Sequence, residues 1–515
     1  MTKSSITGIN INWPHDSVHG YLQQVMKEFH YLYSVCQHPP QETGVLKYMS
    51  EVFICRGGSG GGGSGGIWNG YAKILEYKVF NKPGSNGFNM PFNIVNNKVD
   101  IFVYGAGGGG WMYTTYSSGN KYGGGGGGWM NRIYNVSLVP GKTYNVYVGL
   151  SGYSKEDELG TNSILTNYTV AGSSSYFDTY VSANGGSAGR ANGIGGSGGS
   201  GGAGTYGGGR GYQFGGGAAI WEGNGSYAYD YTTNGLLKGG DGGVWGGGGG
   251  GMFSNGGNGG YYGGGGGTSR LKNDWLSSSS ISTGGNGGYY GGGGGSINNI
   301  ALGGYYNDNG TWKQSGFGGN GGNLTVEGEN GTNTIGYTNF KVHTNEGFNE
   351  VNYNLAGNGI SIKCSDANNK GWSSGGGGYG GTGGNRASSP IAWHQTGSGC
   401  GGGGGYGSSG GDGMDTRYYD YYPGGGGGGG YGGNGSSYGG GGGYMSDGYG
   451  GGGGYWSDGQ YRGGGGGKLS IPVNNTYETY QFGNGASPQG TVQVPAGEGI
   501  VVLRYYKWVD PRNPT

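Results

Sequence analysis

Glycine is the residue that most constrains this chain, because 146 of its 515 residues are glycine and many stand in uninterrupted runs. A residue without a Cβ cannot fill a hydrophobic core, and it loses more backbone entropy on folding than any other residue. Such a composition is usual in flexible linkers, but it also lets two backbones approach closely enough to bond to each other. The longest runs lie at residues 123–128, 246–251, 263–267, 291–295, 401–405, 424–430 and 463–467.

These runs predict extended rods that are held together by main-chain hydrogen bonds. A polyglycine II helix would have three residues per turn and a rise of about 3.1 Å per residue, with N–H and C=O groups that point outward. Packed side by side, such rods bond to their neighbours, which only the missing Cβ allows. We therefore expect a mainly β and irregular fold: a bundle of polyglycine II helices bracketed by β-strands, with a small N-terminal helical segment.

The composition argues against several classes of protein. The 28 Lys and Arg residues are matched by 28 Asp and Glu residues, so the chain lacks the basic surplus of a nucleic-acid binder. Its four cysteines are far apart and predict free thiols rather than a disulfide framework. The first residues lack the apolar stretch of a secretory signal, and no run of about 18 apolar residues predicts a membrane span.

Residues 1–56 predict a docking or assembly segment that completes its core against a partner or another copy. Asp16 is a candidate helix N-cap, and Pro39–Pro40 end this element. Four apolar residues on one helical stripe are the candidates for docking: Leu22, Val25, Met26 and Phe29. Residues 57–71 predict a glycine-rich linker, in which GGSGGGGSGG at 57–66 is either native or engineered.

Conventional β-structure is predicted on both sides of the glycine-rich region. Residues 72–150 predict β-strands and a hairpin, because AKILEYKVF and FNIVNNKVDIFVYG are strand-like and Pro140-Gly141 separates two further strand-like runs. Within the second run, Val99, Ile101 and Val103 alternate with Asp100, Phe102 and Tyr104. Residues 151–467 predict the polyglycine II core with inserted loops, and residues 468–515 predict C-terminal closing strands.

Aromatic residues adjoin the glycine runs, and we expect them to cover the faces of the slab that the rods form. The alternative is a binding surface at loop tips, since Tyr and Trp are strong recognition residues. The residues are Trp111, Trp129, Tyr261, Tyr262, Tyr289, Tyr290 and Tyr431. Two short sequences also recur: GGNGGYYGGGGG at 256–267 and 284–295, and YMSDG at 444–448 as YWSDG at 455–459.

Three motifs together resemble the glycine-rich domain of tailed-phage tail-fibre and virion proteins. They are FNIVNNKVDIFVYGAGGGG at 92–110, VPGKTYNVYVGLSG at 139–152 and GEGIVVLRYY at 497–506, and the resemblance covers roughly residues 90–506. The chain also resembles the tip adhesins of long tail fibres. That resemblance implies a sandwich of polyglycine II rods, a location on the virion surface after assembly in the host cytoplasm, and loops at one end that bind the host.

The sequence predicts a non-enzymatic receptor-binding protein of a virion. Its expected partners are a host cell-surface protein or glycan, other virion or tail-fibre proteins through residues 1–56, and additional copies of the chain, but no nucleic acid. The candidate receptor-binding residues lie in the segment Met414–Pro423 and in the paired YMSDG and YWSDG loops: Tyr418, Tyr419, Tyr421, Tyr422, Tyr444 and Trp456. Exposed Tyr and Trp faces suit carbohydrate stacking or protein contact.

Two other functions remain open from the residues alone. The first is a purely structural virion decoration, fibre or extracellular filament subunit, whose loops contact other copies. The second is an enzyme such as a glycan depolymerase, which would need paired carboxylates in a cleft that the sequence does not nominate. No cofactor is expected, His and Cys spacing does not match a metal site, and a calcium site at Asp447 and Asp458 has only weak support.

Overall fold

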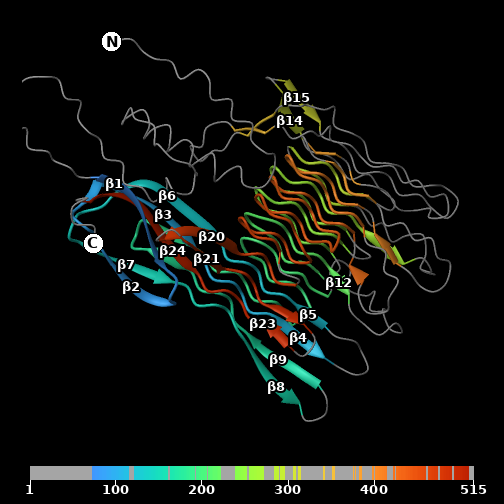
Figure 1. Ribbon diagram of the computed structural model, residues 1–515. Helices are drawn as coiled ribbons and strands as arrows, with labels where there is room; N and C mark the ends of the chain where they lie inside the picture. The colour runs from blue at the N-terminus through green and yellow to red at the C-terminus, as the bar shows by residue number, and fades with distance from the viewer. Residues whose placement is uncertain are drawn as a thin grey trace, which may run out of the picture.

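The computed structural model of the chain describes part of the 515 residues, and its described portion is mainly β with no α-helix (Figure 1). The helix predicted near Leu22 and Phe29 falls outside the described residues. The described residues are 72–114, 121–159, 163–191, 193–205, 207–221, 238–251, 255–271, 284–288, 290–295, 305–308, 311–314, 340–342, 351–353, 375, 377–378, 382–385, 397–399, 401–413, 422–423, 425–459, 462–473, 476–489 and 492–509.

Two four-stranded sheets pack face to face beside the glycine-rich region. Sheet A has the order β1 (Ala72–Phe80), β24 (Ile500–Val509), β3 (Ile94–Tyr104) and β6 (Met130–Ser137), and all its neighbours are antiparallel. Sheet B has the order β11 (Val181–Ala183), β10 (Ser175–Phe177), β7 (Thr143–Val148) and β2 (Gly84–Asn89). The last described strand of the chain thus lies between the first and the third, which joins both ends of the glycine-rich region to one sheet.

The core between these sheets follows the alternation that the sequence predicts for β3. Val99, Ile101 and Val103 are buried in the cluster that also holds residues of sheet B, such as Val146 and Phe177. The opposite side of sheet A is covered by the hairpin of β20 (Gly467–Val473) and β21 (Thr476–Phe482). There Tyr104 meets Phe482, with ring centroids 4.9 Å apart. Sheet A therefore has apolar contacts on both faces.

The hairpin predicted around Pro140-Gly141 is wrong, although both of its strands exist. β6 pairs with β3 in sheet A, whereas β7 pairs with β2 and β10 in sheet B. The turn is present, since the N–H of Lys142 donates to the carbonyl of Val139 at 3.2 Å. Both flanking strands turn apolar residues into the same core, so the chain crosses from one layer of the sandwich to the other.

The remaining strands are short and pair locally or across the glycine-rich region. A third four-stranded sheet has the order β5 (Lys121–Gly123), β4 (Trp111–Thr114), β9 (Ser163–Thr169) and β8 (Ser154–Leu159). The two-stranded pairs are β12 (Ile220–Trp221) with β19 (Tyr422–Pro423), β13 (Ser269–Leu271) with β18 (Gly397–Gly399), β14 (Tyr305–Asp308) with β15 (Thr311–Gln314), β16 (Phe340–Val342) with β17 (Val351–Tyr353), and β22 (Ser487–Gln489) with β23 (Val492–Val494).

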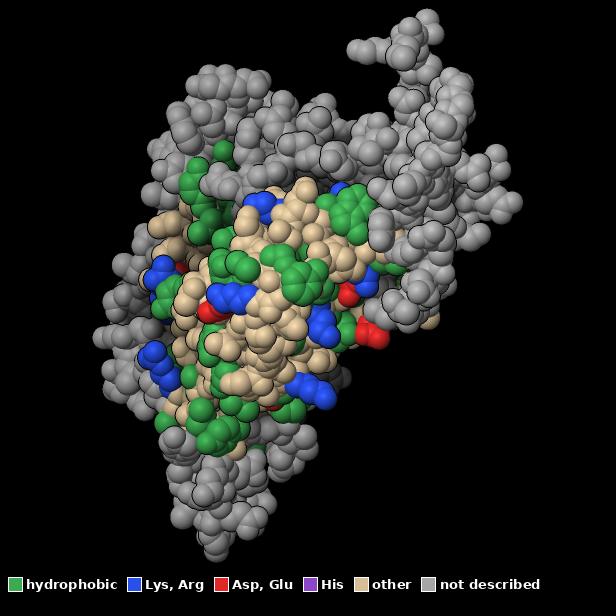
Figure 2. Space-filling view, turned by 90° about the vertical axis from the view of Figure 1, so that its left-hand side faces the viewer, with side chains coloured by type: hydrophobic (Ala, Val, Ile, Leu, Met, Phe, Trp, Pro, Cys, Tyr) green, Lys and Arg blue, Asp and Glu red, His purple; other side chains and the backbone are tan. Residues whose placement is uncertain are grey.

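Beyond the sheets, the glycine segments run side by side and form a slab (Figure 1). β3 continues directly into residues 105–110, and residues 123–128 lead into β6. Farther along, four layers are bonded in sequence: segment 238–243 to 246–251, segment 246–251 to 425–430, and segment 425–430 to 433–436. The face of the molecule on the side of the sheets shows scattered hydrophobic groups among Lys and Arg side chains rather than one broad apolar area (Figure 2).

The segment Gly246–Gly251 shows how a glycine run is held inside the slab. Each of its six N–H groups donates a main-chain hydrogen bond and each of its six carbonyls accepts one, with N···O distances of 2.6–3.1 Å. Partners repeat every third residue. The N–H groups of Gly247 and Gly250 donate to Gly442 and Gly439 of one neighbouring segment, and those of Gly248 and Gly251 donate to Gly264 and Gly267 of another. All backbone polar groups of this interior run are therefore satisfied without side chains.

These bonds form only because no Cβ intervenes between the segments. A Cβ built on Gly249 would lie 2.0 Å from the carbonyl oxygen of Gly217, and one on Gly248 would lie 1.9 Å from that of Gly257. Rigid backbone occupies both positions, so a methyl group cannot be accommodated by a side-chain movement. Glycine in the run Gly246–Gly251 is thus required by the approach of neighbouring backbones, since none of these residues has a positive φ.

We expect Gly249→Ala to destabilise the protein by about 1–3 kcal/mol or more, because the added methyl group must push two segments apart. Gly87→Ala in β2 is the matched control, since a Cβ there would meet only Thr143 Cγ2 at an ordinary 3.5 Å. Urea unfolding of the two variants measures the difference. Equal midpoints for Gly249→Ala and Gly87→Ala would contradict the packing described here.

Candidate functional site

The glycine segments have two different ends, and one of them carries short aromatic turns. The chain reverses there within two residues at Val244–Trp245 and Tyr261–Tyr262, where the N–H groups of Gly246 and Gly263 close the turns by donating to the carbonyls of Gly243 and Gly260. Further turns of this end lie at Tyr406, Tyr431, Tyr444 and Tyr455. We call it the turn end.

Rings at the turn end stack into two columns. In the first, the centroids of Trp245 and Tyr262 are 4.9 Å apart with planes at 2°, and Tyr262 and Tyr290 are 5.2 Å apart at 10°. In the second, Tyr406, Tyr431, Tyr444 and Tyr455 follow one another at 5.4, 5.0 and 5.4 Å with planes at 1°, 2° and 14°. Each of these turns thus contributes one ring to one of the two stacks.

The two columns meet edge to face, which is the favourable geometry for aromatic quadrupoles. The ring centroid of Tyr262 lies 5.6 Å from that of Tyr406 and 5.3 Å from that of Tyr431, and in both pairs the ring planes make an angle of 82°. At the sheet side, Tyr455 contacts Phe214, whose cluster also contains Tyr104 and residues of sheet A. We call the two columns together the aromatic spine. Its apolar contacts continue from the slab into the cluster on the face of sheet A that the hairpin of β20 and β21 covers.

The second column is built from four copies of one turn. Each copy has the pattern Tyr-x-Ser/Gly-Ser/Asn/Asp, and its second residue has a positive φ: 64° at Gly407, 65° at Gly432, 49° at Met445 and 53° at Trp456. The glycine before each tyrosine donates its N–H to the carbonyl of the third residue, as in Gly405 to Ser408 and Gly454 to Ser457. Although the tyrosines are 25, 13 and 11 residues apart in the sequence, they are consecutive in space.

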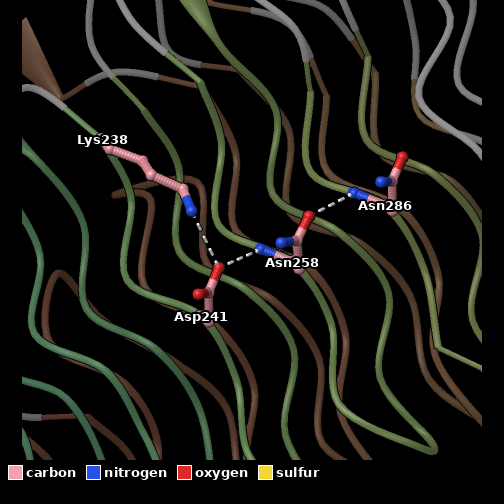
Figure 3. A network of polar contacts seen from close by, with 4 residues as sticks. All are labelled: Lys238, Asp241, Asn258 and Asn286. Atoms are coloured by element: carbon pink, nitrogen blue, oxygen red, sulfur yellow. Dashed lines mark hydrogen bonds and ion pairs between the residues drawn. The ribbon is translucent and has the colours of Figure 1, made fainter. Parts of the chain in front are cut away.

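Polar side chains form ladders along the two outer layers of the slab. In the first ladder, Asp241 Oδ1 accepts from the N–H of Asn258 at 2.8 Å, and Asn258 Oδ1 accepts from the N–H of Asn286 at 3.0 Å (Figure 3). Lys238 Nζ lies 3.3 Å from Asp241 Oδ1 in an ion pair. In the second ladder, the N–H groups of Ser409, Asn434 and Asp447 donate in the same way to the next residue of the ladder. The acceptors are the Oδ1 atoms of Asn434, Asp447 and Asp458, at 2.8, 2.9 and 3.1 Å. The ladders supply acceptors to N–H groups of these outer layers.

At the opposite end of the segments, the longer insertions leave and rejoin the slab. They comprise residues 222–237, 272–283, 296–374, 386–396 and 414–421. A main-chain hydrogen bond joins Gly295 to Gly401, which lie near two of these insertions. Residues near the others bond to Gly250 or Gly251 at the same end, in the pairs Ala219–Gly250, Gly425–Gly251 and Gly251–Gly267. β12, which precedes the first insertion, lies at the side of the slab away from β1 and β24 (Figure 1). We call this side the insertion end.

The structure separates the candidate receptor-binding residues that the sequence nominates. Tyr422 belongs to β19 at the insertion end, where it pairs with Trp221. Tyr444 and Trp456 lie at the turn end, and Tyr444 is stacked between Tyr431 and Tyr455. The six-residue segment Gly425–Gly430 separates the two groups, which is roughly 20 Å of extended chain. Tyr418, Tyr419 and Tyr421 fall outside the described residues, as do Leu22, Val25, Met26 and Phe29.

The aromatic residues that we expected to cover the slab faces do not all have the same position in the structure. Tyr262, Tyr290 and Tyr431 instead belong to the spine at the turn end, with Tyr262 and Tyr431 buried. Tyr261 is exposed beside them, and Tyr289 falls outside the described residues. For the spine residues the expected covering of the slab faces was wrong, because neither that expectation nor the alternative of a binding surface at loop tips considered that rings of successive turns stack on one another. The pattern Tyr-x-Ser/Gly-Ser/Asn/Asp was a usable signal, but its variable spacing hid it.

The described residues contain no group of three or more His, Cys, Asp or Glu side chains that could hold a metal ion. Within that same part of the chain, no helix has the length and apolar character needed to cross a membrane. Searches of protein-family models, curated proteins and solved structures found no match to this chain. Its function must therefore be argued from the slab and its two ends.

We expect Asp447→Asn to stabilise the protein at neutral pH. Burial, and to a lesser extent the neighbouring Asp458, raises the pKa of the Asp447 carboxyl, while the hydrogen bond from the Asn434 N–H lowers it. A raised pKa means that the folded state is penalised as the pH rises through the range where the unfolded carboxyl ionises. Asparagine keeps the Oδ1 acceptor, as Asn258 does in the first ladder, and carries no charge.

Thermal unfolding as a function of pH measures this effect. The melting temperature of Asp447→Asn should exceed that of the natural chain near pH 7, and the two should converge near pH 3, below the ordinary pKa of Asp at about 3.9. Asp447→Ala is the control, because it lacks the acceptor and should be less stable at every pH. A natural chain that is the more stable one at pH 7 would contradict the argument.

Proposed function

We propose that this protein is a non-enzymatic adhesin of a tailed-phage virion, located at the tip of a tail fibre, that recognises a receptor on the host surface. The observation that carries the proposal is the common end at which the insertions 222–237, 272–283, 296–374, 386–396 and 414–421 leave and rejoin the slab. Segments far apart in the sequence are thereby presented together on a hydrogen-bonded support, which is how many binding proteins arrange recognition loops.

We propose further that the glycine segments are polyglycine II helices. The repetition of hydrogen-bond partners at every third residue of Gly246–Gly251 supports this, since that helix has three residues per turn. The glycines of this segment also lie outside the left-handed region of backbone dihedral angles. An atomic-resolution crystal structure should give φ near about −75° and ψ near about 145° along this run. Dihedral angles of an α-helix or a pleated strand would contradict the assignment.

A rigid slab suits adhesion for an energetic reason. Loop entropy grows only slowly with length, so long insertions at one end cost the scaffold little stability. The turn end allows no such freedom, because each turn must place its tyrosine on the stack between neighbours such as Tyr431 and Tyr455. Variation in receptor recognition is thus compatible with an unchanged slab.

The proposed partners follow from the same division. The insertion 414–421 with its adjoining Tyr422 would contact a host cell-surface protein or glycan through Tyr418, Tyr419, Tyr421 and Tyr422. Residues 1–56 would attach the protein to other virion or tail-fibre proteins through Leu22, Val25, Met26 and Phe29. The protein would then be located on the virion surface. Tyr444 is stacked on both faces, so we propose for it a scaffold role rather than receptor contact.

The test is competition for phage adsorption by the purified protein on a panel of bacterial strains. The natural chain should bind cells of a susceptible strain and block adsorption, whereas the quadruple variant Tyr418→Ala, Tyr419→Ala, Tyr421→Ala and Tyr422→Ala should block it at least tenfold less. Tyr477→Ala is the control, since Tyr477 is an exposed tyrosine on the β21 hairpin.

Two results would count against the proposal. Full competition by a folded quadruple variant would show that these tyrosines are not the contact. No binding to any strain, together with regular self-assembly of the purified protein, would favour the purely structural subunit instead.

A further inference from the structure

A pair of tyrosines projects from the insertion end on two neighbouring turns. The ring centroids of Tyr438 and Tyr449 are 4.3 Å apart with planes at 46°, and Tyr449 is 39% exposed. This pair belongs neither to the aromatic spine nor to the candidate residues that the sequence nominated. We call it the tyrosine pair.

The backbone that carries the tyrosine pair is fixed to the slab. Each tyrosine is followed by a glycine with positive φ, 86° at Gly439 and 68° at Gly450. The carbonyls of these glycines accept main-chain hydrogen bonds from Gly250 at 2.6 Å and Ala218 at 2.9 Å. A Cβ on Gly439 would lie 2.8 Å from the Ala218 Cβ, so the turns are packed against the layer beneath. The backbone that carries the two rings is therefore held in place before any ligand arrives.

The position of the tyrosine pair places it among the insertions. Ala218, which bonds to the second turn, lies just before β12, and β12 ends where the insertion 222–237 begins. Gly250, which bonds to the first turn, is next to Gly251, and Gly251 accepts from Gly425 just after β19. The two rings therefore lie at the same end of the slab as the described residues that border the insertions 222–237 and 414–421.

The chemistry of the tyrosine pair favours an uncharged ligand with hydroxyl groups. A hydrogen bond between the two side chains, followed by burial, raises the pKa of Tyr449 to about 12. Like any tyrosine it is uncharged at physiological pH, so the pair offers no charge to an ionic ligand. Each tyrosine offers an apolar ring face together with a hydroxyl that donates and accepts hydrogen bonds. A pyranose ring has the complementary arrangement, with C–H bonds on one face and hydroxyl groups around its rim.

We propose that the Tyr438–Tyr449 pair is a stacking platform for a sugar ring of a bacterial surface polysaccharide. The inference rests on the proposed adhesin function and specifies the receptor class as glycan. Tyrosine is suited to this role because it supplies a large contact area with few rotatable bonds to immobilise, and here the backbone is held as well.

Binding to an array of bacterial surface polysaccharides and neutral hexose oligosaccharides tests the platform. We expect the natural chain to bind a subset of the array, and Tyr449→Ala to bind it about tenfold more weakly. Tyr449→Phe, which keeps the ring and loses the hydroxyl, should fall between the two. Tyr477→Ala is the matched control, with an exposed tyrosine on β21 and unchanged binding expected. Melting temperatures establish that each variant is folded.

The outcomes separate this inference from the adhesin proposal. If the natural chain adsorbs to cells but binds no glycan, or if cells lose adsorption after protease treatment, the receptor is a protein and the platform is wrong. If folded Tyr449→Ala binds the array as well as Tyr477→Ala does, the platform is also wrong, although the adhesin proposal stands. If the natural chain binds neither cells nor glycans, both fail.

Discussion

The structure depends on main-chain hydrogen bonds between segments that have no Cβ. In the run Gly246–Gly251 every N–H and C=O is used. A Cβ on any residue from Gly246 to Gly250 would lie only 1.7–2.1 Å from a backbone atom of another segment. A hydrogen bond contributes about 0.5–1.5 kcal/mol net, whereas fixing the backbone of one residue costs about 1–2 kcal/mol. The lattice by itself is thus close to neutral in free energy, and something with side chains must stabilise it.

The aromatic spine and the sheets supply that stabilisation. Stacked and edge-to-face ring pairs add about 0.5–1.5 kcal/mol each beyond the area they bury, and the spine contains many such pairs. Its first column includes Trp245 and its second ends at Tyr455 beside Phe214, so the same apolar contacts that order the turns join the slab to the core around Tyr104. Glycine provides close approach between segments, while the aromatic turns determine which segments become neighbours.

Much of the β-structure could be predicted from the sequence, and the reason is local. The strands at Ala72–Phe80, Ile94–Tyr104 and Ile500–Val509 have apolar alternation or strand-forming residues that a short window detects. The strand that pairs with β6 could not be predicted in the same way. β6 and β7 both contribute apolar residues to one core, and this pattern is expected whether the two strands pair in one sheet or lie in two facing sheets. The turn repeat was missed for a different reason. Its copies are consecutive in space but separated by unequal lengths of chain, so a search at a fixed period finds only YMSDG and YWSDG.

The unequal spacing has its own physical explanation, and it bears on how the candidate site is organised. A tyrosine such as Tyr431 must stack on Tyr406 whatever the chain does between them, and the path between them passes through the insertion end, where 414–421 is accommodated. The path from Tyr431 to Tyr444 needs only the short turn that carries Tyr438. The turns of the turn end are therefore constrained by ring stacking, whereas the length of chain at the insertion end can vary. A scaffold with this asymmetry can accept new sequence at one end without altering the contacts that hold it together, which is the property that a variable recognition surface requires.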